Sequence, residues 1–296
     1  GYFSENSVFY QTVNAFKDEE AIKKQEYMDC MSKPYRSSTL DDEFNAAFEG
    51  LKKSGVAIYF KDINNDYVWN MNSTKIYYSA STSKLFEVIY LVEEARKGNI
   101  DLNSTLVYKP SDAMQGSIGM KKHKYYDEVT LSELIDHLLT YSDNTAHFML
   151  IKYIGLDTLK EYFSDFNLVM VSEDPFVRNY TALMASKCLE RLYSVLEVDD
   201  DYSALIKKAM NNKNMNYLSF DDKIIYHKYG MYDASFHDIG IYDSDNPYII
   251  VVLTLYGNLG QDVFGPKVQN ISKKVYEIYS KNLELKEEYC QSNVSK

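Results

Sequence analysis

Two side chains in the stretch Tyr77–Phe86 could do chemistry together: Ser81 and Lys84, spaced as Ser-x-x-Lys. A serine hydroxyl is a weak nucleophile until a neighbouring base removes its proton, and a desolvated lysine amine can be that base. The pattern predicts a helix over residues 81–97, which places both side chains on one face, with Ser81 beside the free N–H groups of the helix start. The alternative is a capping serine followed by a surface lysine, and this stretch alone favours that alternative.

A second candidate is the tripeptide Ser142–Asn144, which reads Ser-Asp-Asn. The same tripeptide recurs at Ser244–Asn246, between two predicted strands and before a proline, where it consists of turn-forming residues. The first copy follows Ser-x-x-Lys and joins helices predicted at 131–140 and 145–153. Because a short loop between two helices can project a hydroxyl and an amide into a cleft, we expect only this copy to belong to a site.

The third candidate comprises Lys228, Tyr229 and Gly230, in a strand predicted at 223–232. A lysine followed two positions later by glycine on an edge strand lets a substrate lie along the backbone. The cation would meet a carboxylate, and the glycine would leave room for the ligand.

The elements that must position these residues fall into early strands, central helices and late strands. A hairpin is predicted around an Asn-Asn turn, and a switch to β periodicity predicts three strands near the C-terminus. The predicted elements are strands at 56–60 and 67–69, helices at 81–97, 131–140, 145–153, 156–163 and 183–196, strands at 223–232, 236–242 and 248–256, and a closing helix at 268–283. One sheet of about five strands, built from both ends of the chain, is an α+β layout. Residues 1–38 are predicted to be an N-terminal helical appendage to a domain at 39–296.

Composition excludes several function classes. The 296 residues carry a net charge of −11, so most of the surface would repel a phosphate backbone, and we expect no nucleic-acid partner. The longest apolar run, Tyr248–Tyr256, falls short of the roughly 20 residues that span a bilayer, so no transmembrane segment is predicted.

The five histidines show no H-E-x-x-H motif or ligand spacing, so we expect no metal site. His227 and His237 are predicted to be packing residues on strands.

The three cysteines are odd in number and lack C-x-x-C spacing, which argues against a disulfide framework and a metal site. A Cys30–Cys290 bridge joining the two ends of the chain is one alternative. Cys188 lies in an apolar helical stripe and is predicted to be a core residue.

Taken in order, Ser-x-x-Lys, Ser-Asp-Asn and Lys-x-Gly resemble the motifs of class A β-lactamases and the wider group of penicillin-recognising serine hydrolases, which includes the D,D-peptidases. The likeness runs from about Leu40 to Leu283. It implies a β-lactamase/transpeptidase-like α+β fold, with an antiparallel sheet and helices on both of its faces. It also implies a hydrolase that needs no cofactor and acts on a β-lactam or a peptidoglycan stem peptide.

The resemblance implies a role for each matched residue. Ser81 would be the acylated nucleophile and Lys84 its activating base. Ser142 would relay a proton to the leaving nitrogen, Asp143 would brace its loop and Asn144 would hold a substrate amide. Lys228 would attract the substrate carboxylate beside Tyr229 and Gly230, and the backbone N–H groups of Ser81 and Met231 would form the oxyanion hole.

Two departures from the family pattern concern turnover. The omega-loop motif Glu-x-x-Leu-Asn, whose glutamate activates the deacylating water, is missing from a segment shorter by about a dozen residues. Glu173 or Asp174 is an alternative base, although a carboxylate beside a proline in a short loop is usually a solvated turn. Tyr229 stands where the family has a small hydroxyl, so the carboxylate pocket must differ. Acylation is therefore expected to be better preserved than fast hydrolysis.

Three functions remain open: a serine acyl-hydrolase acting on β-lactams or D-Ala-D-Ala peptides, a penicillin-binding sensor that stays acylated, and a non-hydrolysing cell-wall binding protein. The chain opens at Gly1 rather than Met, which fits removal of a leader. Cell-wall substrates imply an extracellular or cell-surface protein, secreted or anchored by that leader.

Overall fold

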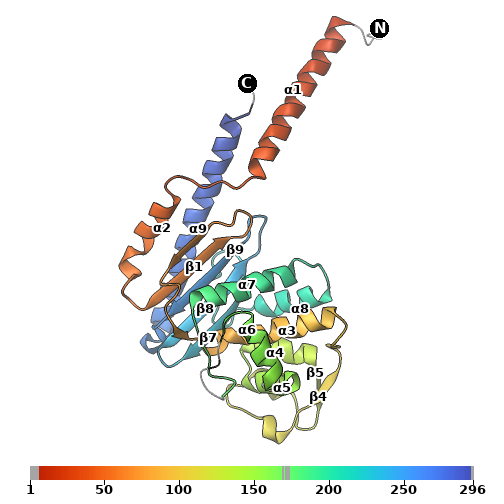
Figure 1. Cartoon of the computed structure of the whole chain (residues 1–296), viewed down its shortest axis with the longest axis vertical. Helices are drawn as coiled ribbons and strands as arrows, with labels where there is room; N and C mark the ends of the chain where they lie inside the picture. The colour runs from red at the N-terminus through yellow and green to blue at the C-terminus, as the bar shows by residue number, and fades with distance from the viewer. Residues whose placement is uncertain (1–6, 169, 171–173, 295–296) are drawn as a thin grey trace.

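A five-stranded antiparallel sheet forms the centre of the molecule (Figure 1). The computed structural model describes residues 7–168, 170 and 174–294. The strand order is β2-β1-β9-β8-β7, so the N-terminal hairpin pairs with the C-terminal strands. The strands are β1 Val56–Asp62, β2 Val68–Met71, β7 Ile225–Tyr232, β8 Ser235–Tyr242 and β9 Tyr248–Thr254. The predicted sheet of about five strands built from both chain ends is therefore confirmed.

The central strand explains how the two chain ends are held together. All seven residues of β9 are buried, because both faces of the sheet are covered at this position. Its register places Ile250 opposite Phe60 of β1 and Gly240 of β8. The apolar run that the sequence offers at this point is therefore the middle of the sheet.

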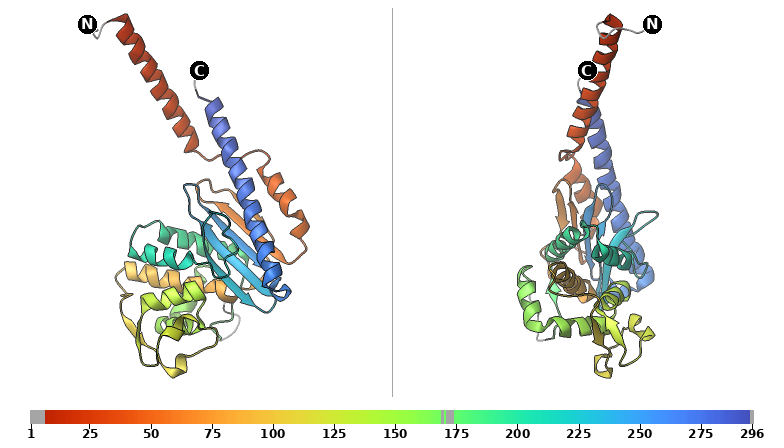
Figure 2. Two further views of the ribbon diagram at one scale, coloured as in Figure 1. Left: turned by 180° about the vertical axis from the view of Figure 1, so that it is seen from behind. Right: turned by 90° about the vertical axis from the view of Figure 1, so that its right-hand side faces the viewer.

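Helices cover both faces of the sheet, as predicted (Figure 2). On one face, α2 and α9 bury an aromatic cluster that includes Phe44, Phe60 and Trp69. On the other face, α7 packs on the sheet and the remaining central helices enclose a second core. The helices are α2 Leu40–Phe48, α3 Leu85–Arg96, α4 Leu131–Tyr141, α5 Asn144–Ile154, α6 Leu156–Ser164, α7 Ala182–Leu196, α8 Asp201–Met210 and α9 Gln261–Ser292. Cys188 is buried in the second core, as expected.

Some predicted boundaries were wrong. The predicted 81–97 helix begins as a 3-10 turn, η2 (Ala80–Lys84), and becomes α-helical only at Leu85. The closing helix is longer than predicted at both ends, and it contains Pro266 in its second turn, where a proline cannot donate the hydrogen bond to the carbonyl four residues earlier. Helix α8 was not predicted, nor were two small sheets that pair β3 (Tyr77–Tyr78) with β6 (Asn179–Tyr180) and β4 (Thr105–Val107) with β5 (Glu128–Thr130).

Helix α1 (Val8–Met31) and the end of α9 project together from one end of the molecule (Figures 1 and 2). No residue of α1 is buried. A disulfide joins Cys30 on α1 to Cys290 on α9, so the bridge that the sequence left as one alternative is present. No helix in the described residues is both long and apolar enough to cross a membrane.

Candidate active site

The turn that carries Ser81 lies directly against strand β7. A Cβ atom added at Gly230 would lie 2.6 Å from the backbone nitrogen of Ser81, so no larger residue fits without displacing one of the two segments. Ala80 has a φ of +48°, a conformation that costs a residue with a Cβ about 1–2 kcal/mol. This close contact brings the predicted nucleophile, which is half-buried, and the Lys-x-Gly strand together. Met231 follows Gly230 on this strand and is 46% exposed.

Lys84 is buried, and its amine contacts the loop between α4 and α5. Its Nζ donates to the backbone oxygen of Ser142 at 2.8 Å, to Ser142 Oγ at 3.2 Å and to Asn144 Oδ1 at 2.7 Å. Burial lowers the pKa of Lys84 to about 7, assisted by the positive charge of Arg178 and opposed by Asp143 and Glu87. A lysine with this pKa is partly neutral at physiological pH and can accept a proton.

The backbone and Asp143 together fix the loop that meets Lys84. Ser142 ends α4 in the left-handed conformation, with φ 55° and ψ 39°. The Oδ1 atom of Asp143 accepts from Ala146 N at 2.8 Å as the N-cap of α5, while Oδ2 accepts from Met120 N at 2.9 Å. Asn144 donates through Nδ2 to the backbone oxygen of Gln115 at 2.9 Å. The loop is thus held from both sides.

The second Ser-Asp-Asn copy serves as a turn. Ser244–Asn246 joins β8 to β9, and Asn246 N donates to Ser244 Oγ at 3.1 Å. The sequence prediction that separated the two copies agrees with these positions.

Lys228 is buried on β7, close enough to Lys84 for the two charges to repel. Its Nζ donates to the backbone oxygen of Tyr229 at 2.7 Å and lies 4.5 Å from the centre of the Tyr229 ring. Burial, and then the charge of Lys84, lower the pKa of Lys228 well below its usual value, while Asp238 opposes them. The Tyr229 side chain hydrogen-bonds Asn214. The phenol is therefore committed to partners that a small hydroxyl could not reach.

The histidines on β7 and β8 are hydrogen-bonded packing residues, as predicted. His227 Nδ1 lies 2.7 Å from Asp238 Oδ1. His237 Nδ1 accepts from Thr254 N at 3.0 Å, so its Nε2 carries the proton and donates to the backbone oxygen of Tyr78 at 2.7 Å. His237 thereby supports the segment that leads into the nucleophile turn. Within the described residues, no group of three or more His, Cys, Asp or Glu side chains could hold a metal ion.

A buried charged cluster behind the nucleophile turn was missed in the sequence. Glu87 and Arg178 are completely buried and form an ion pair, and His147 Nε2 lies 3.0 Å from Glu87 Oε1. The one available signal was Glu87 itself, an acidic residue three positions after Lys84 in an otherwise apolar stretch. Its partners could not be identified because they come from segments distant in the sequence.

The segment in which the resemblance implies an omega loop provides one of these partners, Arg178. Glu173, one of the two alternative deacylating bases, lies outside the described residues. Asp174 is exposed, and its Oδ1 accepts from Phe176 N at 2.9 Å in a turn. A solvated turn is the expectation for a carboxylate beside a proline here, and the exposed position of Asp174 agrees with it.

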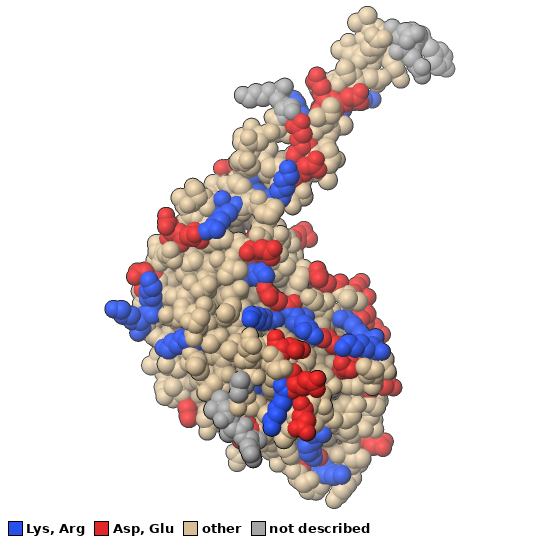
Figure 3. All heavy atoms as spheres, in the orientation of Figure 1, with Lys and Arg blue, Asp and Glu red and all other residues tan. Residues whose placement is uncertain are grey.

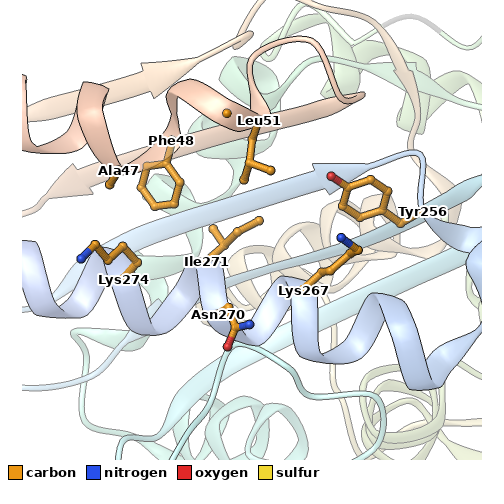
Figure 4. Close-up of a pocket in the computed structure, with 9 residues that line it drawn as sticks. Ala47, Phe48, Leu51, Tyr256, Lys267, Asn270, Ile271 and Lys274 are labelled. Carbon is orange, nitrogen blue, oxygen red and sulfur yellow. The ribbon is translucent and has the colours of Figure 1, made fainter.

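Two surface grooves lie outside this cluster. One of about 510 Å³ lies between α2, the turn after it, and α9, with Phe48, Leu51 and Ile271 as its floor and Lys267 and Lys274 beside it (Figure 4). It contains none of the predicted site residues. Another, of about 610 Å³, is lined by Tyr108 and by residues of the segment 113–125, including Gln115, and adjoins the Asn144 loop. Acidic and basic side chains are interspersed over the face drawn in Figure 3.

Comparison with known proteins identifies the family. A family model described as "Beta-lactamase enzyme family" matches residues 39–279. The β-lactamase BRO-1 of Moraxella catarrhalis is 30% identical over 103 residues, which span 33% of this chain and 32% of that protein. Similar solved structures include the TLA-1 extended-spectrum β-lactamase (TM-score 0.71, 19% identity, 81% of this chain and 99% of that one) and a Xanthomonas campestris β-lactamase (0.70, 14%, 81% and 97%). The fold is that of class A β-lactamases, and the chain belongs to the β-lactamase enzyme family.

Proposed function

We propose that this protein is a serine hydrolase that forms an acyl-enzyme on Ser81 with β-lactams or D-Ala-D-Ala-type peptides and releases the product slowly. The observation that carries the proposal is the environment of Lys84, whose buried amine has a pKa near 7 and lies one helical turn from Ser81. A base with this pKa can activate a serine at neutral pH.

The proposed acylation uses groups from three segments. Lys84 takes the Ser81 proton as Oγ attacks the substrate carbonyl, and the backbone N–H groups of Ser81 and Met231 receive the oxyanion. Ser142, hydrogen-bonded to Lys84 Nζ, passes the proton to the leaving nitrogen. Asn144 orients the substrate amide, and Lys228 attracts the substrate carboxylate. The contact of Gly230 with Ser81 supports this arrangement, because it places the edge of β7 beside the nucleophile.

The contacts of two described carboxylates near the site support the proposal of slow deacylation. Glu87 is ionised, but its charge is directed at Arg178 and His147. Asp174 is exposed and accepts a backbone hydrogen bond in its own turn. Both carboxylates thus have protein partners, which favours a role in structure over activation of a water. We therefore expect an acyl-enzyme lifetime closer to that of a D,D-peptidase or a sensor than to that of a fast β-lactamase.

The proposed substrates also predict where in the cell the protein is located. Peptidoglycan stem peptides and β-lactams are met outside the cytoplasmic membrane, so the proposed function requires an extracellular or cell-surface protein. Fractionation of the native host, with detection by an antibody against this protein, tests this location. Recovery in the cytosolic fraction alone would contradict it.

The test of function is intact-protein mass spectrometry during incubation with benzylpenicillin. We expect the wild-type protein to gain the mass of one penicillin, and Ser81→Ala to gain none. Ser244→Ala, a serine in a surface turn, is the matched control and should behave as wild type. A parallel assay with a D-Ala-D-Ala peptide separates a peptidase from a sensor. Absence of any adduct on the wild-type protein with either ligand would leave a non-hydrolysing binding protein as the better description.

A further inference from the structure

The side chain of Arg178 links three parts of the molecule behind the candidate site. Its Nη1 donates to the backbone oxygen of Ser83 at 3.0 Å and to Glu87 Oε2 at 3.1 Å, and Nη2 donates to Glu87 Oε1. Its Nε donates to the backbone oxygen of Pro175 at 3.0 Å, within its own segment. The backbone oxygen of Arg178 accepts from Ser79 N at 2.9 Å. One residue therefore contacts both ends of the nucleophile turn and the helix that follows it.

We infer that Arg178 is a positioning residue for acylation: with Glu87 it fastens the segment Pro175–Tyr180 to the nucleophile turn and balances the buried charge beside Lys84. This inference rests on the proposed function. It assigns a role to the segment that replaces the omega loop, in which the sequence revealed only a missing glutamate.

The geometry favours arginine over lysine at this position. A guanidinium presents several N–H donors in one plane, which suits bidentate contact with a carboxylate and further contacts with carbonyl oxygens. The Arg178 guanidinium also lies 4.7 Å from the centre of the Phe163 ring. A lysine at 178 would keep the charge but could not contact Ser83, Glu87 and Pro175 together.

The charges of Glu87 and Arg178, the pair called the clamp below, shift the pKa of Lys84 in opposite directions. Among the described residues, the charged and titratable groups that act on Lys84 are Glu87 on α3, Asp143 and His147 on α5 and its cap, Arg178 from the short segment, and Lys228 on β7. Burial lowers the pKa of His147 to about 4, so this side chain is neutral near pH 7. Burial raises the pKa of Glu87, but Arg178 and His147 more than offset this and bring it to about 2. The Glu87 carboxylate is therefore charged at neutral pH, and its effect on Lys84 is opposite to that of Arg178.

The sign of each substitution follows from these charges. Loss of Glu87 removes a negative charge and should lower the pKa of Lys84, whereas loss of Arg178 should raise it. Because Lys84 acts as a base only when neutral, the rise of the acylation rate with pH should move to lower pH in Glu87→Gln and to higher pH in Arg178→Met. The double variant E87Q/R178M, which removes both charges, should return toward the wild-type position.

The experiment measures the pH profile of the benzylpenicillin acylation rate in the full chain and titrates Lys84 through the NMR signal of ¹³Cε-labelled lysine. Lys84→Met identifies the signal. Arg178→Lys tests positioning separately from charge: it should slow acylation by roughly tenfold or more, as misplacement of a reacting group does, with little movement of the profile. Arg191→Met is the matched control, since it removes the exposed Arg191–Glu93 pair further along α3.

The outcomes distinguish failure of the role proposed for Arg178 from failure of the proposed function. Opposite shifts in the single variants, with recovery in the double variant, support the clamp. Equal profiles in wild type and variants, or shifts of the same sign in both single variants, overturn it. If Arg178→Met does not fold, Arg178→Lys and E87Q/R178M decide. If the wild-type protein forms no acyl-enzyme, the proposed function fails, and the Lys84 titration alone still tests the charge balance.

Discussion

The two sides of the candidate site differ in how far they follow the family. On one side, the nucleophile turn and the Ser142–Asn144 loop meet through Lys84, with three hydrogen bonds from a single amine. On the other, the segment at 174–180 contributes the buried Arg178, and the resemblance implies two departures from the family there, a missing glutamate and Tyr229 in place of a small hydroxyl. Under the proposed function, this difference means that the groups that form an acyl-enzyme are kept, whereas those that hydrolyse it are changed. Substitutions on both sides of the site test this contrast between acylation and deacylation.

The largest effect is expected at Lys84. Lys84→Met should slow acylation by about 10²–10⁴-fold, because it removes the base that activates Ser81. In the wild-type protein, acylation should rise with pH and level off above a pH of about 7, as burial lowers the pKa of the amine to that value. Stopped-flow or quenched mass spectrometry across pH measures both. An acylation rate independent of pH from about 5.5 to 8.5 would contradict the role of Lys84 as the base.

A smaller effect separates the two Ser-Asp-Asn copies. Ser142→Ala should slow acylation by roughly 10²-fold, since its hydroxyl contacts Lys84 and would carry the proton to the leaving group. Ser244→Ala, in the β8–β9 turn, should change the rate less than twofold, on the order of the ±0.5 kcal/mol typical of surface sites. Single-turnover rates at saturating benzylpenicillin make the comparison. Equal rates in the two variants would remove the distinction between the copies.

Tyr229→Thr tests whether the phenol limits binding of the substrate carboxylate by Lys228. The phenol is tied to Asn214 and covers the Lys228 amine, so a threonine should free that amine and restore a small hydroxyl. We expect acylation by benzylpenicillin to quicken by about tenfold, the effect of one added hydrogen bond to a charged group. Methyl esterification of the penicillin carboxylate is the control, and it should abolish the gain. A slower rate in Tyr229→Thr would show instead that the phenol itself assists binding.

The smallest effect on activity is expected at the disulfide. Replacing Cys30 and Cys290 with serine should leave the acylation rate unchanged, because the bridge joins α1 to the end of α9, away from the site (Figure 1). The free energy of unfolding should fall by about 2–4 kcal/mol or less, the usual range for a lost disulfide. Urea unfolding of the double variant, beside reduced wild type, measures the change. A large loss of acylation would link the projecting helices to the site.

Much of this architecture was predictable because it is encoded locally. Alternating and continuous apolar runs determined the strands, and the order of three motifs indicated the family. The Ser-Asp-Asn copies could be separated by their flanking elements alone. The α-helix expected at 81–97 was wrong in its first turn, because packing against Gly230 imposes a 3-10 turn at Ser81 that periodicity does not encode.

The fold class, the strands of the two hairpins and the residue types available for acylation could be predicted from the sequence, since each depends on short-range pattern and composition. The pKa of Lys84 and the partners of Glu87 could be read only from the tertiary structure. Both depend on burial and on charges from distant segments: Arg178 lies 91 residues from Glu87, and Ser142 lies 58 from Lys84. Because a pKa reflects the whole environment of a group, no local pattern could have provided it.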